Sequence, residues 1–123
     1  MIGTSVTADE IASARTWYAS TEGYRSRNII TLNTWTSGTI TLAADFTGLL
    51  NDGTALSTVD SVVLTNDADQ TTVAATGLAR QKGLRNANAV VAAITTASTH
   101  TVAWKVTTTD DQQLTLTGKL TVV

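Results

Sequence analysis

His100 is the single histidine of this 123-residue chain, so a catalytic arrangement of the Ser-His-Asp or Cys-His kind would have to be built on it. It lies two residues before Val102, inside a segment in which apolar and polar residues alternate. In antibody-like sandwiches, an aromatic side chain at such a corner bonds to nearby backbone and has a structural role. The chain also lacks cysteine, which excludes a disulfide framework and a thiolate metal site. We therefore predict that His100 is structural and that the protein is not an enzyme.

Two groups of aspartates carry the right oxygens for Ca²⁺ but not the right spacing. Asp67 and Asp69 lie in the polar segment 66–70, which lacks the twelve-residue ligand pattern, its central Gly and its terminal Glu. Asp110 and Asp111 lie between two alternating segments. Asp side chains commonly bond their own backbone where a chain reverses. We expect turns at both places, and we predict no metal and no cofactor.

A small basic group follows a segment, residues 28–79, that has five aspartates and no Lys or Arg. Arg80, Lys82 and Arg85 surround Gly83 and are expected to form a solvated loop, with an acidic patch on a partner protein as the second interpretation. No aromatic residues are interleaved with them, as they would be in a single-strand binding site. The net charge of −2 argues against nucleic acid or an anionic membrane as partner. No apolar run is long enough for a membrane span.

Two tryptophans receive different predictions. Trp104 lies in an alternating strand and is expected in the core. Trp35 precedes a Thr-Ser-Gly turn, where a half-exposed ring could stack on a sugar. A lone ring gives weak support to a carbohydrate site, and we see no pair of carboxylates placed as in a glycosidase.

The elements that would position these residues are β-strands. The chain has 26 threonines and no proline, and branched Cβ atoms favour strands. Two alternating segments, 99–108 and 113–123, predict a closing hairpin around residues 109–112. Further strands are expected at 28–34, 38–46, 59–65, 71–76 and 89–95, which gives about seven strands, as in a β-sandwich.

Residues 1–27 follow a different pattern. A capping box at residues 7–10 predicts a short helix over residues 8–19. Ile11 and Tyr18 would lie on one stripe of this helix, and Trp17, Tyr18 and Tyr24 would be good anchors. A helix this short needs a surface to pack on, which is either the sandwich of its own chain or a neighbouring subunit. We therefore divide the chain into an N-terminal arm, 1–27, and a sandwich, 28–123.

The segments Thr101–Thr108 and Leu114–Val123 resemble the small immunoglobulin-like structural proteins of tailed bacteriophage virions. The resemblance covers roughly the last quarter of the chain. It implies an all-β, immunoglobulin-like β-sandwich that acts as a capsid decoration or cement protein and binds the major capsid protein or another virion protein. It is compatible with a homo-oligomer, and it offers no catalytic residues. The start of the sequence lacks a secretory signal, so we expect assembly in the host cytoplasm, release by lysis and location in the virion.

Our expected partner-binding residues are Ile11, Trp17, Tyr18, Tyr24, Arg80, Lys82 and Arg85. Deletion of residues 1–27 is expected to leave a folded sandwich that no longer binds. The alternative is a tail, baseplate or fibre component that binds host-surface carbohydrate through loops and exposed aromatic residues such as Trp35.

Overall fold

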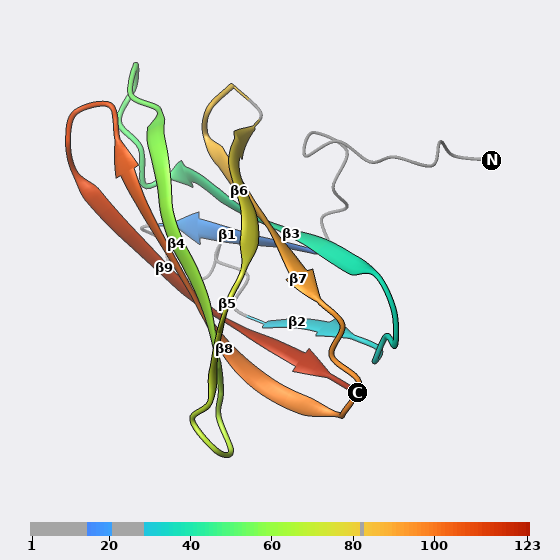
Figure 1. Ribbon diagram of the computed structural model, residues 1–123. Helices are drawn as coiled ribbons and strands as arrows, with labels where there is room; N and C mark the ends of the chain where they lie inside the picture. Colours follow the sequence, from blue (N-terminus) through green and yellow to red (C-terminus); the bar gives the residue numbers. More distant parts are fainter. Residues whose placement is uncertain (1–14, 21–28, 82) are drawn as a thin grey trace.

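The computed structural model describes residues 15–20, 29–81 and 83–123. The regular elements in these ranges are nine β-strands, which form two sheets packed as a sandwich (Figure 1). The prediction of an all-β chain with two packed sheets is confirmed. Within the described residues, no helix is long and apolar enough to cross a membrane.

One sheet has four strands and the other has five. The four-stranded sheet has the order β1 (Thr16–Ser20), β3 (Thr39–Gly48), β7 (Asn86–Ala92) and β6 (Thr76–Gln81). The five-stranded sheet has the order β2 (Ile29–Leu32), β9 (Gln113–Val122), β8 (Ser98–Thr108), β4 (Leu56–Asn66) and β5 (Thr72–Ala74). The β1–β3 and β2–β9 pairs are parallel, and the other pairs are antiparallel. Ala75 alone separates β5 from β6, so the chain changes sheets there within one residue.

The predicted closing hairpin is confirmed. β8 and β9 pair from Thr107 opposite Gln113, next to the turn, to Ser98 opposite Val122. The alternation places the apolar residues of β8 on the inner face, where Trp104 is fully buried. This hairpin forms the centre of the five-stranded sheet, between β2 and β4.

Two β-bulges bring an unpredicted part of β4 into the core. The β4–β8 register skips one residue after Leu56 and one after Val59, and each extra residue is a bulge. Leu56 is an even number of residues from the predicted inward pair, Val62 and Leu64, whereas Val59 is out of step with them; with the two bulges, both Leu56 and Val59 contact the core. The predicted strand, 59–65, therefore misses residues 56–58 of β4.

Two tryptophans join the sheets at the centre of the core. The rings of Trp17 on β1 and Trp104 on β8 are tilted by 59°, with centroids 6.1 Å apart. The Trp17 Nε1–H donates to the carbonyl of Lys119 on β9 at 3.3 Å. Gly118 makes room for this ring, because a Cβ there would lie 2.4 Å from Trp17 Cδ1. The glycine is needed for the close approach of a ring from the opposite sheet.

The predicted helix over residues 8–19 is wrong for residues 16–19, which belong to β1; residues 8–14 lie outside the described residues. Thr16–Ser20 pairs with β3, and the Trp17 side chain is 0% exposed between the sheets. Burial of an indole ring outweighs a local capping signal, because short helices are marginal without tertiary contacts. Part of the predicted arm, residues 16–20, is therefore a strand of the sandwich.

Each of the seven predicted strands has a counterpart, and β6 is the other strand that the sequence did not reveal. Its sequence, Thr-Gly-Leu-Ala-Arg-Gln, has little β-propensity and no clear alternation. It forms because it pairs with β7. The register of this pair shifts after Thr76, and the next residue, Gly77, has a φ of 60°. The expected basic loop is thus wrong for Arg80, which lies on this strand.

Candidate functional site

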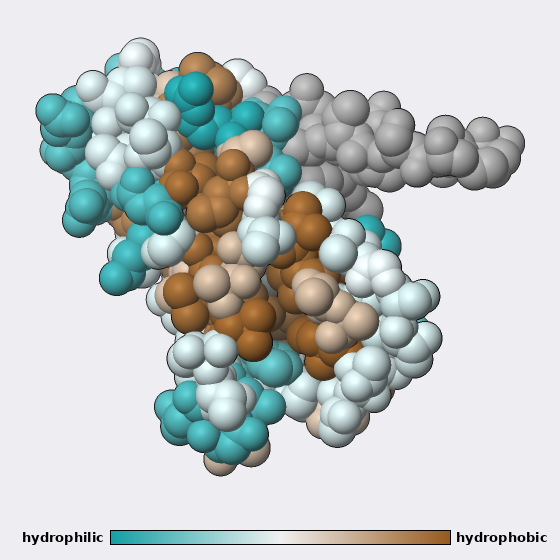
Figure 2. All heavy atoms as spheres, viewed as in Figure 1, coloured by the Kyte–Doolittle hydropathy of each residue, from teal (hydrophilic) through white to brown (hydrophobic). Residues whose placement is uncertain are grey.

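Three connections from distant parts of the sequence meet at one end of the sandwich. They are the β3–β4 loop (49–55), the described part of the β6–β7 turn (83–85) and the β8–β9 tip (109–112), and we call this region the loop end (Figure 1). Gly53 and Gly83 have φ values of 80° and 67°, which glycine adopts without strain. The region is mostly hydrophilic, with a small hydrophobic group beside the β6–β7 turn (Figure 2).

Hydrogen bonds between the three connections hold them together. Ala55 and Thr109 bond in both directions: the Thr109 N–H donates to the Ala55 carbonyl at 2.9 Å, and the Ala55 N–H donates to Thr109 Oγ1 at 3.2 Å. The Leu56 N–H donates to the Leu84 carbonyl at 2.7 Å, which ties the β6–β7 turn to the start of β4. The Phe46 N–H donates to the Arg85 carbonyl at 3.0 Å. The loop end is therefore held together by hydrogen bonds within the chain.

The β8–β9 tip is a side-chain-stabilised turn, as predicted for Asp110 and Asp111. Thr108 Oγ1 donates to Asp110 Oδ1 and accepts from the Gln112 N–H at 3.0 Å. Asp111 has a φ of 61°, a conformation that Asp tolerates better than most residues. Among the described residues, no three His, Cys, Asp or Glu side chains are grouped so that they could hold a metal ion.

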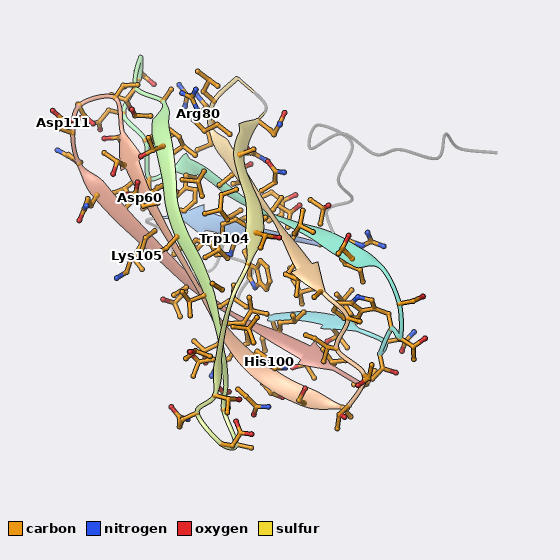
Figure 3. The ribbon with its side chains drawn as sticks, viewed as in Figure 1. Asp60, Arg80, His100, Trp104, Lys105 and Asp111 are labelled. Atoms are coloured by element: carbon orange, nitrogen blue, oxygen red, sulfur yellow. The ribbon has the colours of Figure 1, made fainter. Side chains whose placement is uncertain are left out.

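The two described members of the predicted basic group line one side of the loop end. Arg80 Nη1 donates to the Leu56 carbonyl at 3.2 Å, and Arg85 is half-buried in the turn that follows. Between them in the sequence, Leu84 is 40% exposed, with a φ of 64°. Lys82 lies outside the described residues. Arg80 and Asp111 lie on opposite sides of this end (Figure 3). The exposed Leu84 is therefore part of a surface that carries both signs of charge.

The predicted aromatic anchors are placed differently. Trp17 is part of the core and is 0% exposed, so it offers no surface to a partner. Tyr18 follows it on β1 and is half-buried. Ile11 and Tyr24 lie outside the described residues. Of the predicted partner-binding residues that the structure describes, Arg80 and Arg85 are the two that lie together at one surface.

The opposite end of the sandwich holds His100, with a neighbour that the sequence analysis missed. His100 Nε2 lies 2.8 Å from Ser98 Oγ, and Ser98 Oγ donates to the Thr96 carbonyl at 2.9 Å. Burial lowers the pKa of His100, against the opposing charges of Asp67 and Asp69. Residues two apart on a strand share a face, but the predicted strand begins at residue 99, so the sequence analysis did not place Ser98 beside His100.

This serine–histidine contact does not have the arrangement of a nucleophile and its base. The hydroxyl proton of Ser98 is directed to a backbone carbonyl, whereas a nucleophile would donate it to the imidazole. The Asp67 carboxylate, which could have oriented the ring, instead accepts from Thr101 Oγ1 and Lys119 Nζ, both at 2.7 Å. The contact therefore orients the imidazole ring and does not activate the serine.

The aspartates considered for Ca²⁺ stabilise the β4–β5 turn. The Lys119 ammonium and the Thr101 hydroxyl lower the pKa of Asp67, and hydrogen bonds from Thr71 lower that of Asp69. The Asp69 carboxylate accepts from both the backbone N–H and the hydroxyl of Thr71, at 3.0 and 2.7 Å. Asp69 acts as a turn former, as predicted, whereas the Asp67 carboxylate ties the turn to Thr101 on β8 and Lys119 on β9.

Trp35 is half-buried, in agreement with the half-exposed ring expected from the sequence. Its side chain packs against the core, and its Nε1 is buried without a hydrogen-bond partner among the described residues. Its backbone N–H donates to the Ile94 carbonyl at 3.1 Å. A ring held in this way offers little free face for a sugar.

Comparison of the sequence with protein-family models and with curated proteins finds no match.

Proposed function

We propose that this chain is a non-enzymatic structural protein of a tailed bacteriophage virion, a capsid decoration protein that binds coat subunits through its loop end. The observation that carries the proposal is the set of hydrogen bonds that joins the three connections across both sheets, above all Leu56 N–H to the Leu84 carbonyl at 2.7 Å. A surface that is ordered in advance loses little conformational entropy on binding. It therefore suits a protein that must hold neighbouring subunits in a fixed geometry.

The immunoglobulin-like assignment belongs to the same proposal, and the strand order supports it. In the immunoglobulin fold, one sheet has the order A-B-E-D and the other contains G, F and C as neighbours. The four-stranded order β1-β3-β7-β6 corresponds to the first, and β9-β8-β4 corresponds to the second. The departure is β1, which pairs parallel with β3.

The chemistry of the loop end favours a protein partner. Leu84 supplies an exposed apolar contact, and Arg80 and Arg85 lie beside it on the same hairpin. Arginine and apolar side chains at the centre of a patch, surrounded by polar residues, are typical of protein interfaces. We infer that an acidic, partly apolar patch of a coat subunit faces this hairpin.

Binding of the full-length protein to shells assembled from the coat protein of the same genome tests this proposal. Leu84→Ser together with Arg85→Ser should weaken binding at least about tenfold, because two central contacts are lost. The matched control is Ile29→Ser, which removes an exposed apolar residue of β2, away from the loop end. Unchanged binding of the first variant, with its unfolding midpoint preserved, would overturn the proposal.

The structure changes how the N-terminal segment should be tested. Removal of residues 1–27 would delete β1 and the fully buried Trp17, and loss of a buried Trp side chain alone costs about 3–5 kcal/mol. A chain that begins at Arg15 keeps β1. A binding defect in that chain can be attributed to residues 1–14, whereas a defect in the longer deletion cannot.

The second candidate is a tail, baseplate or fibre component that binds host carbohydrate. It is favoured by a hollow of about 370 Å³ on the five-stranded sheet, lined by Asp60, Lys105, Thr107, Gln113, Leu114 and Thr115. Hydrogen bonds from Thr107 and Thr58 lower the pKa of Asp60 and keep it an acceptor. Glycan binding that is lost in Lys105→Ser but kept in Leu84→Ser would favour this candidate over the first.

A further inference from the structure

An apolar cavity opens at the end of the sandwich opposite the loop end. It has a volume of about 210 Å³ and is lined by Leu64 on β4, Val73 on β5, Val91 and Ala92 on β7, Ala93 and Ile94 after β7, and His100 on β8. Hydrophobic side chains lie on both sides of the gap between β5 and the end of β7 (Figure 2). Val73, on the edge strand β5, is 57% exposed at this cavity.

The size of the cavity limits what it can hold. A cavity of about 150 Å³ with apolar walls is enough for benzene. The cavity at this end is larger by the volume of one or two small substituents. A single six-membered ring with a short substituent is therefore the ligand that would fill it.

His100 is the one ionisable side chain in the lining, and we assign its ring proton from the hydrogen-bond network around it. The hydroxyl of Ser98 has one proton, which it donates to the Thr96 carbonyl. In its contact with His100, the serine oxygen must therefore accept, and Nε2 must donate. In the neutral ring, the proton then lies on Nε2, and Nδ1 is a hydrogen-bond acceptor with no partner among the described residues.

The ring is also kept neutral where the ligand would bind. Burial lowers the pKa of His100, and the carboxylates of Asp67 and Asp69, which oppose this shift, are held by their own partners. The same ring lines a second, more polar hollow of about 370 Å³ that includes Ser98 and Thr96. The imidazole therefore lies between the apolar cavity and the more polar hollow.

From this geometry we propose that the cavity binds a phenol, with its ring between Leu64, Val91 and Ile94 and its hydroxyl donating to His100 Nδ1. The same chemistry has two sources, a free phenol and the side chain of a tyrosine on another protein. The apolar walls account for binding of the ring. The single acceptor accounts for a preference for the hydroxylated ring over its hydrocarbon analogue.

Titration of the full-length ¹⁵N-labelled protein with p-cresol and with toluene tests the proposal. Backbone amides of residues 64, 91–94 and 100 should shift saturably with p-cresol, and toluene should bind about fivefold more weakly because it leaves the imidazole unpaired. Equal affinities for the two compounds would overturn the role of His100. Absence of saturable shifts with p-cresol would overturn the site.

Two variants test separately the role of His100 as a hydrogen-bond acceptor and the role of the cavity as the place of binding. His100→Leu should remove the preference for p-cresol while toluene still binds. Ala93→Leu should fill the cavity and abolish binding of both compounds in a folded protein, and p-cresol binding that persists in this variant would place the ligand elsewhere. N-acetyltyrosinamide and N-acetylphenylalaninamide then distinguish the sources: binding of the tyrosine compound alone supports a protein tyrosine, and binding of p-cresol with neither amide supports a free phenol.

Discussion

The two ends of the sandwich differ in how completely the space between the sheets is closed. At the loop end, the turn between β6 and β7 bonds to the first residue of β4, and Leu56 there is fully buried. At the opposite end, hydrogen bonds also join neighbouring loops, as between Trp35 and Ile94, but they flank a hollow. Val73 on the edge strand β5 therefore remains 57% exposed. One end is sealed by backbone bonds between the sheets, and the other stays open and apolar.

This difference shows where each kind of recognition can arise. A sealed end offers a fixed outer surface, which suits contact with another protein. An open end offers an interior, which suits a ring that is small enough to enter. The same pair of sheets thus provides a fixed outer surface at the loop end and an open interior at the other end.

The largest effect on the free energy of unfolding is expected when the same substitution, Ala to Leu, is made once in the packed core and once at the open end. Ala89 and Ala93 lie four residues apart, Ala89 fully buried on β7 and Ala93 in the cavity lining. Ala89→Leu should lower the free energy of unfolding by about 1–3 kcal/mol through overpacking. Ala93→Leu should raise it by about 0.5–1 kcal/mol by filling space. Urea unfolding measures both, and a loss of stability in both variants would contradict an open end.

A smaller effect is expected from the bonds that seal the loop end. Thr108→Val keeps the shape of a side chain that is 2% exposed and removes its hydrogen bonds to Asp110 and Gln112. The free energy of unfolding should fall by about 1–2 kcal/mol, because the hydrogen bonds of the buried Thr108 hydroxyl are lost. The control is Thr115→Val, an exposed threonine on β9. Equal midpoints for the two variants in chemical denaturation would show that the tip does not stabilise this end.

The smallest effect is the pH dependence contributed by His100. Its pKa in the folded state lies below the unfolded value of 6.5 because burial disfavours the charged ring. The unfolded chain therefore binds more protons, so stability is complete above pH 6.5 and declines as the pH falls through 6.5 toward the folded pKa. His100→Gln should flatten the stability profile between pH 5 and 7. A profile whose slope is the same in both proteins would assign the pH dependence to other groups.

Several features of the fold could be predicted because they depend on neighbours in the sequence. The closing hairpin follows from alternation on both sides of residues 109–112, and the pairing of Thr107 with Gln113 agrees with it. The turn roles of Asp69 and Asp110 follow from short polar side chains at chain reversals. Such features need no knowledge of the opposite sheet.

Other features depend on contacts between segments that are far apart in the sequence. The capping signal at residues 7–10 gives no hint that Trp17 occupies the space left by Gly118, about a hundred residues later. β6 forms because β7 is beside it, and the bulges of β4 follow the register of β8. Of the predicted partner-binding residues, Arg80 and Arg85 lie at the loop end, whereas Trp17 lies in the core.

The sequence by itself determined the all-β class, the closing hairpin and the aspartate turns, because alternation and turn chemistry act over a few residues. The tertiary structure decided that Trp17 belongs to a strand, that three connections seal one end, and that Ser98 and His100 meet beside a cavity at the other. These outcomes depend on which surfaces become buried when two sheets pack. Burial is a property of the whole molecule, and it overrides local preference wherever a large side chain must find a partner.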